Sequence, residues 1–274
     1  MRGSLVLAAI LIVIPAMANA QSSDTVLLHS AGSLRGALTE VAKNFEARFE
    51  ASSGAKVEMK YGASGLLKDE IAGGAKAEVF ASANMEHPQA LAKAGKSGPV
   101  VLFARNRLCA LVKPGLVVEP ATLLEVMLDP QVKLGTSTPK ADPSGDYAWE
   151  VFKKAEALKP GAFAVLDKKA LQLLGGPSSP PPPASGRGLY GELIANGTAD
   201  VFLTYCTNAQ VAVAENPGQR VVALPDNLAV GADYGLTVMA TASPAAYRLA
   251  MFILSPDGQR ILAKHGFAAP ALPQ

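Results

Sequence analysis

Ser30-Ala31-Gly32-Ser33-Leu34 links a short apolar run at residues 26–28 to a helical pattern that begins at Leu34. The apolar run is typical of a buried strand, and the apolar residues after the turn recur at the three- and four-residue spacing of a helix. A turn of small residues at a helix start leaves backbone N–H groups without intrahelical partners, and the helix dipole adds partial positive charge there. This stretch therefore predicts a strand–turn–helix unit whose turn favours a bound anion.

The same alternation of strand and helix continues along the chain, and it is typical of an α/β fold with a mainly parallel sheet. A segment at residues 177–183 interrupts it with five prolines, and we expect an extended surface loop there. Further strands are predicted at 57–61, 77–82, 108–112, 132–135, 201–205, 221–224 and 234–240. Helices are predicted at 34–49, 66–71, 123–128, 144–158, 189–194, 244–254 and 257–265, with one more after Asn208.

Residues 1–20 have the pattern of an export signal. Arg2 gives a positive start, residues 5–14 form an apolar core, and Ala18-Asn19-Ala20 is a small-x-small cleavage site. We expect cleavage before Gln21 and export to a bacterial periplasm, with the extracellular space as the alternative. The apolar core is shorter than the about 20 residues that cross a bilayer, and no later stretch reaches that length, so we expect no stable membrane insertion.

The composition argues against several classes of partner. A formal net charge of +2 over 274 residues, with no basic cluster and few aromatic residues, argues against nucleic acid. The absence of a CxxC pair and the presence of only three scattered histidines argue against zinc. Cys109 and Cys206 are an even pair, which can form a disulfide in an oxidising compartment; two buried thiols are the alternative.

Four small-residue turns at predicted helix starts share one design, and a tyrosine at a strand end accompanies them. The turns contain Ser33, Ser64, Ser144 and Gly186, and Tyr205 ends the strand at 201–205. In α/β sheets, ligands bind beyond the carboxyl ends of strands, where such turns collect. Each neutral donor to an anion contributes about 1.5–3 kcal/mol, so a small anion needs no Lys or Arg there. The alternative for each serine is an ordinary N-cap, and for Tyr205 a place in the core.

Five segments occur in an order that resembles the periplasmic molybdate-binding receptors of ABC transporters, over nearly the whole mature chain. The resemblance implies two α/β lobes, each a mixed, mainly parallel sheet with flanking helices, joined by two crossing strands near 105–111 and 233–238. Lobe 1 would comprise 21–105 and 236–274, and lobe 2 would comprise 106–235. The segments are Ala31-Gly32-Ser33-Leu34, Tyr61-Gly62-Ala63-Ser64-Gly65, Ala77-Glu78-Val79-Phe80-Ala81-Ser82-Ala83, Asp142-Pro143-Ser144-Gly145-Asp146-Tyr147-Ala148, and Gly258-Gln259-Arg260-Ile261-Leu262 with Gly266-Phe267.

Carried over onto these positions, the resemblance implies a site for a dehydrated tetrahedral oxyanion. Ser33 and Ser64 would donate hydroxyl groups from lobe 1, Ser144 and Gly186 would donate backbone N–H groups from lobe 2, and Tyr205 would donate its hydroxyl. The expected ligand is molybdate or tungstate, and these residues would reach the metal only through its oxygens. The resemblance further implies a monomer that has no cofactor, catalyses no reaction and delivers its ligand to an inner-membrane ABC permease.

The same donor types also suit sulfate or another small anion, so a related receptor is the main alternative. A ferric-iron receptor typically offers adjacent tyrosines, whereas Cys206 follows Tyr205 here. A more distant alternative is an exported hydrolase with His29 as its base, although the chain has no GxSxG elbow.

Three charged residues next to the predicted site have simpler roles. Asp142 and Asp146 would repel an oxyanion as carboxylates, so we expect them to cap a helix, pair or face solvent. Arg187 resembles a family arginine, and a surface or hinge ion pair is its alternative role.

Overall fold

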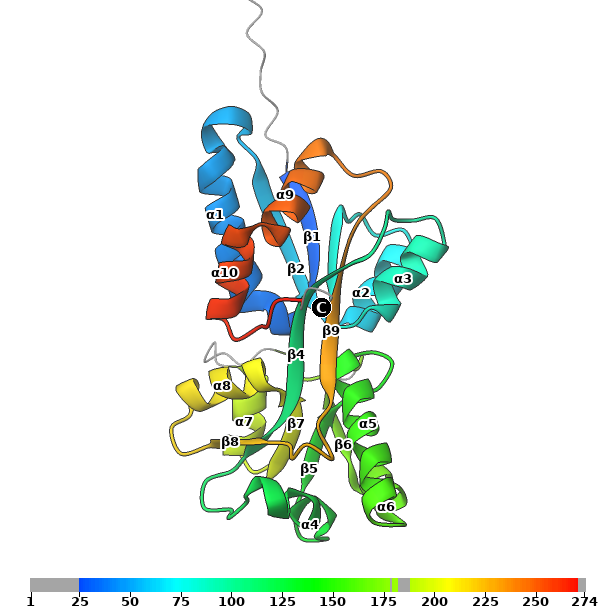
Figure 1. Ribbon diagram of the computed structural model, residues 1–274, viewed down its shortest axis with the longest axis vertical. Helices are drawn as coiled ribbons and strands as arrows, with labels where there is room; N and C mark the ends of the chain where they lie inside the picture. The colour runs from blue at the N-terminus through cyan, green and yellow to red at the C-terminus, as the bar shows by residue number, and fades with distance from the viewer. Residues whose placement is uncertain (1–24, 178, 182–187, 271–274) are drawn as a thin grey trace, which may run out of the picture.

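The computed structural model describes residues 25–177, 179–181 and 188–270, with only the backbone for 50–53. The predicted signal peptide at 1–20, Gly186 and Arg187 lie outside these residues. Figure 1 shows two α/β lobes, one above the other, joined by the long strands β4 (Val101–Val112) and β9 (Gly231–Val238). The two-lobed fold expected from the sequence is therefore present.

Lobe 1 is built on β1 (Thr25–Ala31), which lies between two parallel neighbours in the sheet. Leu28 of β1 and Leu34, Leu38 and Phe45 after it are all at most 1% exposed, so the predicted apolar face of the first helix packs in the core. The other elements of the lobe are β2 (Lys56–Gly62), β3 (Val79–Ser82), α1 (Arg35–Ser53), α2 (Ser64–Ala72), α3 (Glu86–Lys93), α9 (Pro244–Leu254) and α10 (Pro256–Lys264).

The two crossing strands make the sheet mixed. β9 pairs antiparallel with β3 over Gly235–Val238 and with β4 over Gly231–Leu236, and β4 pairs with lobe 2 from Leu108 onward. Between the lobes the two strands form an antiparallel ribbon that contains the fully buried Tyr234. The complete order is β2-β1-β3-β9-β4-β7-β5-β6, with β8 also paired to β4.

Lobe 2 repeats the layered arrangement around β5 (Leu134–Ser137) and β7 (Val201–Tyr205), which are parallel. Cys109 of β4 and Cys206, the first residue of α8 (Cys206–Glu215), form a disulfide with a Cα–Cα distance of 4.8 Å. The remaining elements are β6 (Leu171–Leu174), β8 (Arg220–Ala223), α4 (Leu123–Leu128), α5 (Pro143–Leu158), α6 (Ala162–Lys169) and α7 (Leu189–Ala195). In the described part of the chain, no helix has both the length and the apolar character that a membrane span requires.

The sequence patterns missed α3, α6, β6 and the first half of β4. Polar residues interrupt the apolar pattern in β4, where Arg105, Asn106 and Arg107 retain exposed surface because the inter-lobe ribbon is open to solvent. β6 has only one buried residue, Leu174, and pairs only with β5 in the sheet order, so it lacks a continuous apolar signal.

Candidate functional site

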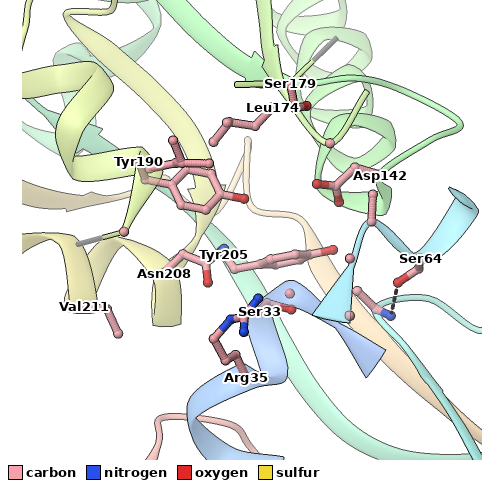
Figure 2. Close-up of a pocket in the computed structure, with 18 of the residues that line it drawn as sticks. Ser33, Arg35, Ser64, Asp142, Leu174, Ser179, Tyr190, Tyr205, Asn208 and Val211 are labelled. Carbon is pink, nitrogen blue, oxygen red and sulfur yellow. Dashed lines mark hydrogen bonds between the residues drawn. The ribbon is translucent and has the colours of Figure 1, made fainter. Parts of the chain in front are cut away.

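A cavity of about 840 Å³ lies between the two lobes. Lobe 1 contributes the turn after β1 and the start of α2, while lobe 2 contributes residues that follow β6 and β7 and the face of α8 (Figure 2). The cavity therefore lies beyond the carboxyl ends of strands, where ligands bind in α/β sheets. Its polar lining includes Ser33, Arg35, Ser64, Asp142, Tyr190, Tyr205 and Asn208.

Ser33 lies in the turn after β1 and is linked to the inter-lobe ribbon. Its Oγ is 3.0 Å from the hydroxyl oxygen of Tyr234, and Asn106 Nδ2 donates to that same tyrosine oxygen at 3.4 Å. Because the amide nitrogen can only donate, Tyr234 accepts from Asn106 and can use its own proton for Ser33. The hydroxyl proton of Ser33 is then available to a ligand in the cavity.

Ser64 is the first residue of α2 and is 1% exposed. Its Oγ accepts a hydrogen bond from the backbone N–H of Ala83 at 3.0 Å. A hydroxyl that accepts from one group still has its own proton to donate. Ser64 thus offers a second hydroxyl donor from lobe 1, positioned by the residue that follows β3.

Tyr205 ends β7, is 2% exposed and lines the cavity from the lobe 2 side. Its hydroxyl makes no hydrogen bond of standard geometry to any described residue. Burial raises the pKa of Tyr205 well above its usual value, so the phenol stays protonated and can donate. A buried donor that lacks a partner is costly, and a bound anion would satisfy it.

The structure separates Ser144 from the other predicted site residues. Ser144 is fully buried but does not line the cavity, and its backbone N–H donates to Asp142 Oδ1 at 3.0 Å. Asp142 is the N-cap of α5, as expected, yet it also lines the cavity, which the sequence analysis did not foresee. Asp146 accepts from the Lys140 backbone N–H at 2.8 Å. Gly186 lies outside the described residues.

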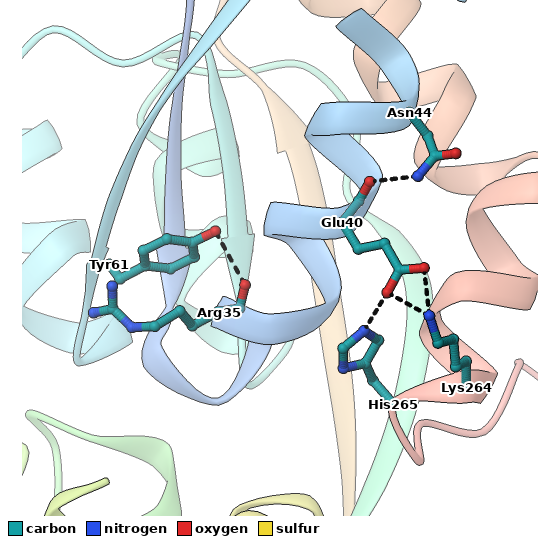
Figure 3. Close-up of polar contacts among 6 residues, drawn as sticks. All are labelled: Arg35, Glu40, Asn44, Tyr61, Lys264 and His265. Atoms are coloured by element: carbon teal, nitrogen blue, oxygen red, sulfur yellow. Dashed lines mark hydrogen bonds and ion pairs between the residues drawn. The ribbon is translucent and has the colours of Figure 1, made fainter. Parts of the chain in front are cut away.

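Arg35 is a lining residue that the sequence analysis also missed. Its guanidinium carbon is 4.4 Å from the ring centroid of Tyr61, so the charge is held against an aromatic face (Figure 3). One signal in the sequence was its position directly after the Ser33-Leu34 turn, on the first turn of α1. Among its described lining residues, the cavity therefore contains one cation in addition to its neutral donors.

A polar cluster fixes the orientation of α1 beside the cavity. Glu40 of α1 accepts from Lys264 Nζ at 2.8 and 3.0 Å, and its Oε2 lies 2.9 Å from His265 Nε2 (Figure 3). The hydrogen bond from Lys264 lowers the pKa of Glu40 more than any other contact, so this carboxylate is ionised at neutral pH. These contacts hold the segment that contains Ser33 and Arg35 against the C-terminal helix.

The lobes already touch on one side of the cavity. The backbone N–H of Gly65 donates to the Ala141 carbonyl at 2.9 Å, and the Tyr147 hydroxyl donates to the Ala83 carbonyl at 3.4 Å. Gly65 follows Ser64 in the chain, so the residue that contacts lobe 2 is adjacent to one of the hydroxyl donors of lobe 1. The structure is thus closed at the edge formed by α2 and α5.

The described lining residues do not favour the exported hydrolase or a resident metal. His29 is buried on β1 and is not among them, and burial lowers its pKa, which leaves the imidazole neutral. Among the described residues, no group of three or more His, Cys, Asp or Glu side chains is arranged to hold a metal ion.

Comparison with known proteins places this geometry in a family. Residues 26–268 match the model of the family described as bacterial extracellular solute-binding protein. The chain is 34% identical over 213 residues to the uncharacterized protein PM1146 of Pasteurella multocida, covering 77% of this chain and 87% of that one. It is 26% identical over 269 residues to the molybdate-binding protein ModA of Mycobacterium tuberculosis, covering 91% of this chain and 87% of that one.

The sulfate-binding protein SubI of Mycobacterium tuberculosis has the same fold, with a TM-score of 0.71 and 19% identity, covering 90% of this chain and 87% of that one. A likeness at this identity concerns the fold, whereas the family match spans nearly all of the described chain. The chain therefore belongs to the family of bacterial extracellular solute-binding proteins.

Proposed function

We propose that this protein is a periplasmic receptor for a tetrahedral oxyanion, molybdate or tungstate, which it delivers to an inner-membrane ABC permease. The observation that carries the proposal is the buried hydroxyl of Tyr205, which makes no hydrogen bond of standard geometry to the described residues and faces the same cavity as the hydroxyls of Ser33 and Ser64. Neutral donors that come from both lobes suit an anion that has lost its water shell. The similarity to a molybdate-binding relative supports the choice of anion.

In this proposal the ligand stabilises the closed arrangement of the lobes, because Ser33 and Ser64 lie on one lobe and Tyr205 lies on the other. A ligand shifts an equilibrium between open and closed forms only by as much as it binds one form better. An anion that accepts from both sets of donors meets this condition. No chemical step is required, since capture and release are sufficient for transport.

Calorimetry on ligand-stripped protein tests the choice of ligand. We expect molybdate and tungstate to release binding heat at 1:1 stoichiometry and to bind more tightly than sulfate, phosphate or ferric citrate. Tight binding of sulfate together with no heat from molybdate or tungstate would assign the protein to sulfate. Binding of ferric citrate alone would reject an oxyanion receptor.

Removal of a single hydroxyl tests the donor set. Ser33→Ala and Tyr205→Phe are each expected to weaken oxyanion binding at least tenfold, which corresponds to about 1.4 kcal/mol. The reason is that each variant leaves an anion oxygen without a donor in a buried site. Titration calorimetry with molybdate measures the change.

Ser30→Ala is the matched control, because Ser30 is fully buried three residues before Ser33 but does not line the cavity. Its affinity should equal that of the natural sequence. Unchanged affinity in Ser33→Ala would mean that Ser33 serves only the start of α1.

A further inference from the structure

A carboxyl group lies in the wall of the proposed anion cavity. Asp142 occupies the N-cap position of α5, and its Oδ1 accepts the backbone N–H of Ser144 at 3.0 Å. The residue also lines the cavity, and Figure 2 shows its carboxyl group near the hydroxyl end of Tyr205 and above Ser64. One carboxyl oxygen therefore caps the helix, and the Ser137 hydroxyl also hydrogen-bonds to the carboxyl group, which lies in the cavity wall.

The groups that face Asp142 do not neutralise it. They are Ser137 on β5, Asp146 on the same helix, Tyr190 on α7 and Tyr205 on β7, and each of these is acidic or neutral. Within the described residues, no lysine or arginine forms an ion pair with Asp142. Arg35 lines the same cavity but is held over Tyr61.

An ionised carboxylate and an oxyanion would repel each other in this cavity. A single proton between them turns the repulsion into a charge-assisted hydrogen bond. Burial favours that proton, because it raises the pKa of Asp142 to about 6, even though the hydrogen bonds from the Ser144 backbone and the Ser137 side chain lower it. The group thus changes its protonation state within the physiological range.

We propose that the bound oxyanion shares one proton with Asp142, so that this residue decides which anions the cavity accepts at a given pH. The inference rests on the proposed function and adds to it a criterion by which the cavity selects among anions. A fully deprotonated anion such as molybdate or sulfate requires a protonated Asp142. Hydrogenphosphate, or another phosphoryl group that carries its own proton, can donate to the ionised carboxylate.

The sign of the pH dependence follows from this rule. Above pH 6 the free protein holds Asp142 ionised, so binding of molybdate must first take up a proton. We expect molybdate affinity to fall about 50-fold between pH 6 and pH 8, given a pKa of about 6. The affinity for hydrogenphosphate should change much less over the same interval, because the ligand supplies the proton.

The variant Asp142→Asn removes the titratable carboxyl group but keeps the shape of the side chain. Asparagine can still accept from Ser144 and cap α5, so the fold is retained, and its NH₂ group then faces the cavity as a permanent donor. We expect the variant to bind molybdate and sulfate with affinities that vary less than threefold between pH 6 and pH 8. Asp146→Asn is the control, because Asp146 does not line the cavity, and it should retain the steep dependence.

The test is titration calorimetry with molybdate, sulfate and phosphate at pH 6 and pH 8, with molybdate also in two buffers of different ionisation enthalpy. At pH 7.5, the binding of molybdate should be coupled to the uptake of about one proton in the natural protein and in Asp146→Asn. No proton should be taken up when Asp142→Asn binds molybdate. Equal pH profiles and equal proton uptake in all three proteins would overturn the inference alone. The absence of heat from every oxyanion at both pH values would overturn the proposed function and the inference together.

Discussion

Gly65→Ala is expected to weaken oxyanion binding about 100-fold, which corresponds to about 2.7 kcal/mol. Gly65 is the second residue of α2, and its N–H donates to Ala141 of lobe 2 at 2.9 Å. A Cβ atom at this position would collide with the backbone oxygen of Lys140 and would lie 2.6 Å from that of Ala141. Since backbone atoms cannot move aside as a side chain can, the lobes must separate.

The separation would draw Ser33 and Ser64 away from Tyr205, so that one ligand could no longer contact both lobes. Calorimetry with molybdate measures the affinity, and small-angle scattering of the ligand-free protein should show a larger radius of gyration. Gly231→Ala is the control on a crossing strand, because an added Cβ there meets nothing within 4 Å. If Gly65→Ala bound molybdate with the affinity of the natural sequence and kept its radius of gyration, the contact between α2 and α5 would not be required for closure.

Reduction of the disulfide is expected to lower the free energy of unfolding by about 2–4 kcal/mol. Cys109 and Cys206 are 97 residues apart in sequence, so the bond restricts a long loop in the unfolded chain. In the native protein it also ties β4 to the first residue of α8, directly after Tyr205. Urea unfolding with and without dithiothreitol measures the change.

The double variant Cys109→Ala/Cys206→Ala is the control for this experiment, because it removes the bond permanently. Its unfolding midpoint should lie below that of the oxidised protein and should not respond to the reductant. Equal midpoints for the oxidised and reduced natural protein would contradict a stabilising role. Thiol counting on denatured, unreduced protein provides an independent check that the bond is present.

The local sequence was sufficient to predict the first two strand–turn–helix units of lobe 1. The small turn at Ser33 and the one at Ser64 follow parallel strands β1 and β2, and the structure brings both to one cavity. In lobe 2 the same pattern around Ser144 was less informative. There the cap residue Asp142, two positions earlier, faces the cavity, while Ser144 is buried beside it.

The difference between these two residues illustrates what local patterns leave undetermined. Both lie in one polar turn at a helix start, and periodicity cannot say which of them points outward. The rotation of α5 follows from close packing with other segments: the Asp142 side chain lies against Gly175, where a Cβ would collide with it, and Gly145 approaches the backbone of residues 137–139. The contact between Asp142 and Gly175 joins segments that are far apart in the chain.

The sequence alone determined the alternation of strands and helices, the small turns that suit an anion and the presence of two cysteines. These properties depend on interactions within about ten residues, such as helical periodicity and turn geometry. Only the tertiary structure decided that β9 inserts between β3 and β4, that the cysteines meet, and that Asp142 and Arg35 join Ser33, Ser64 and Tyr205 at one cavity. The physical reason is that long-range strand pairing sets the relative position of the lobes, and with it every contact between side chains that belong to different lobes.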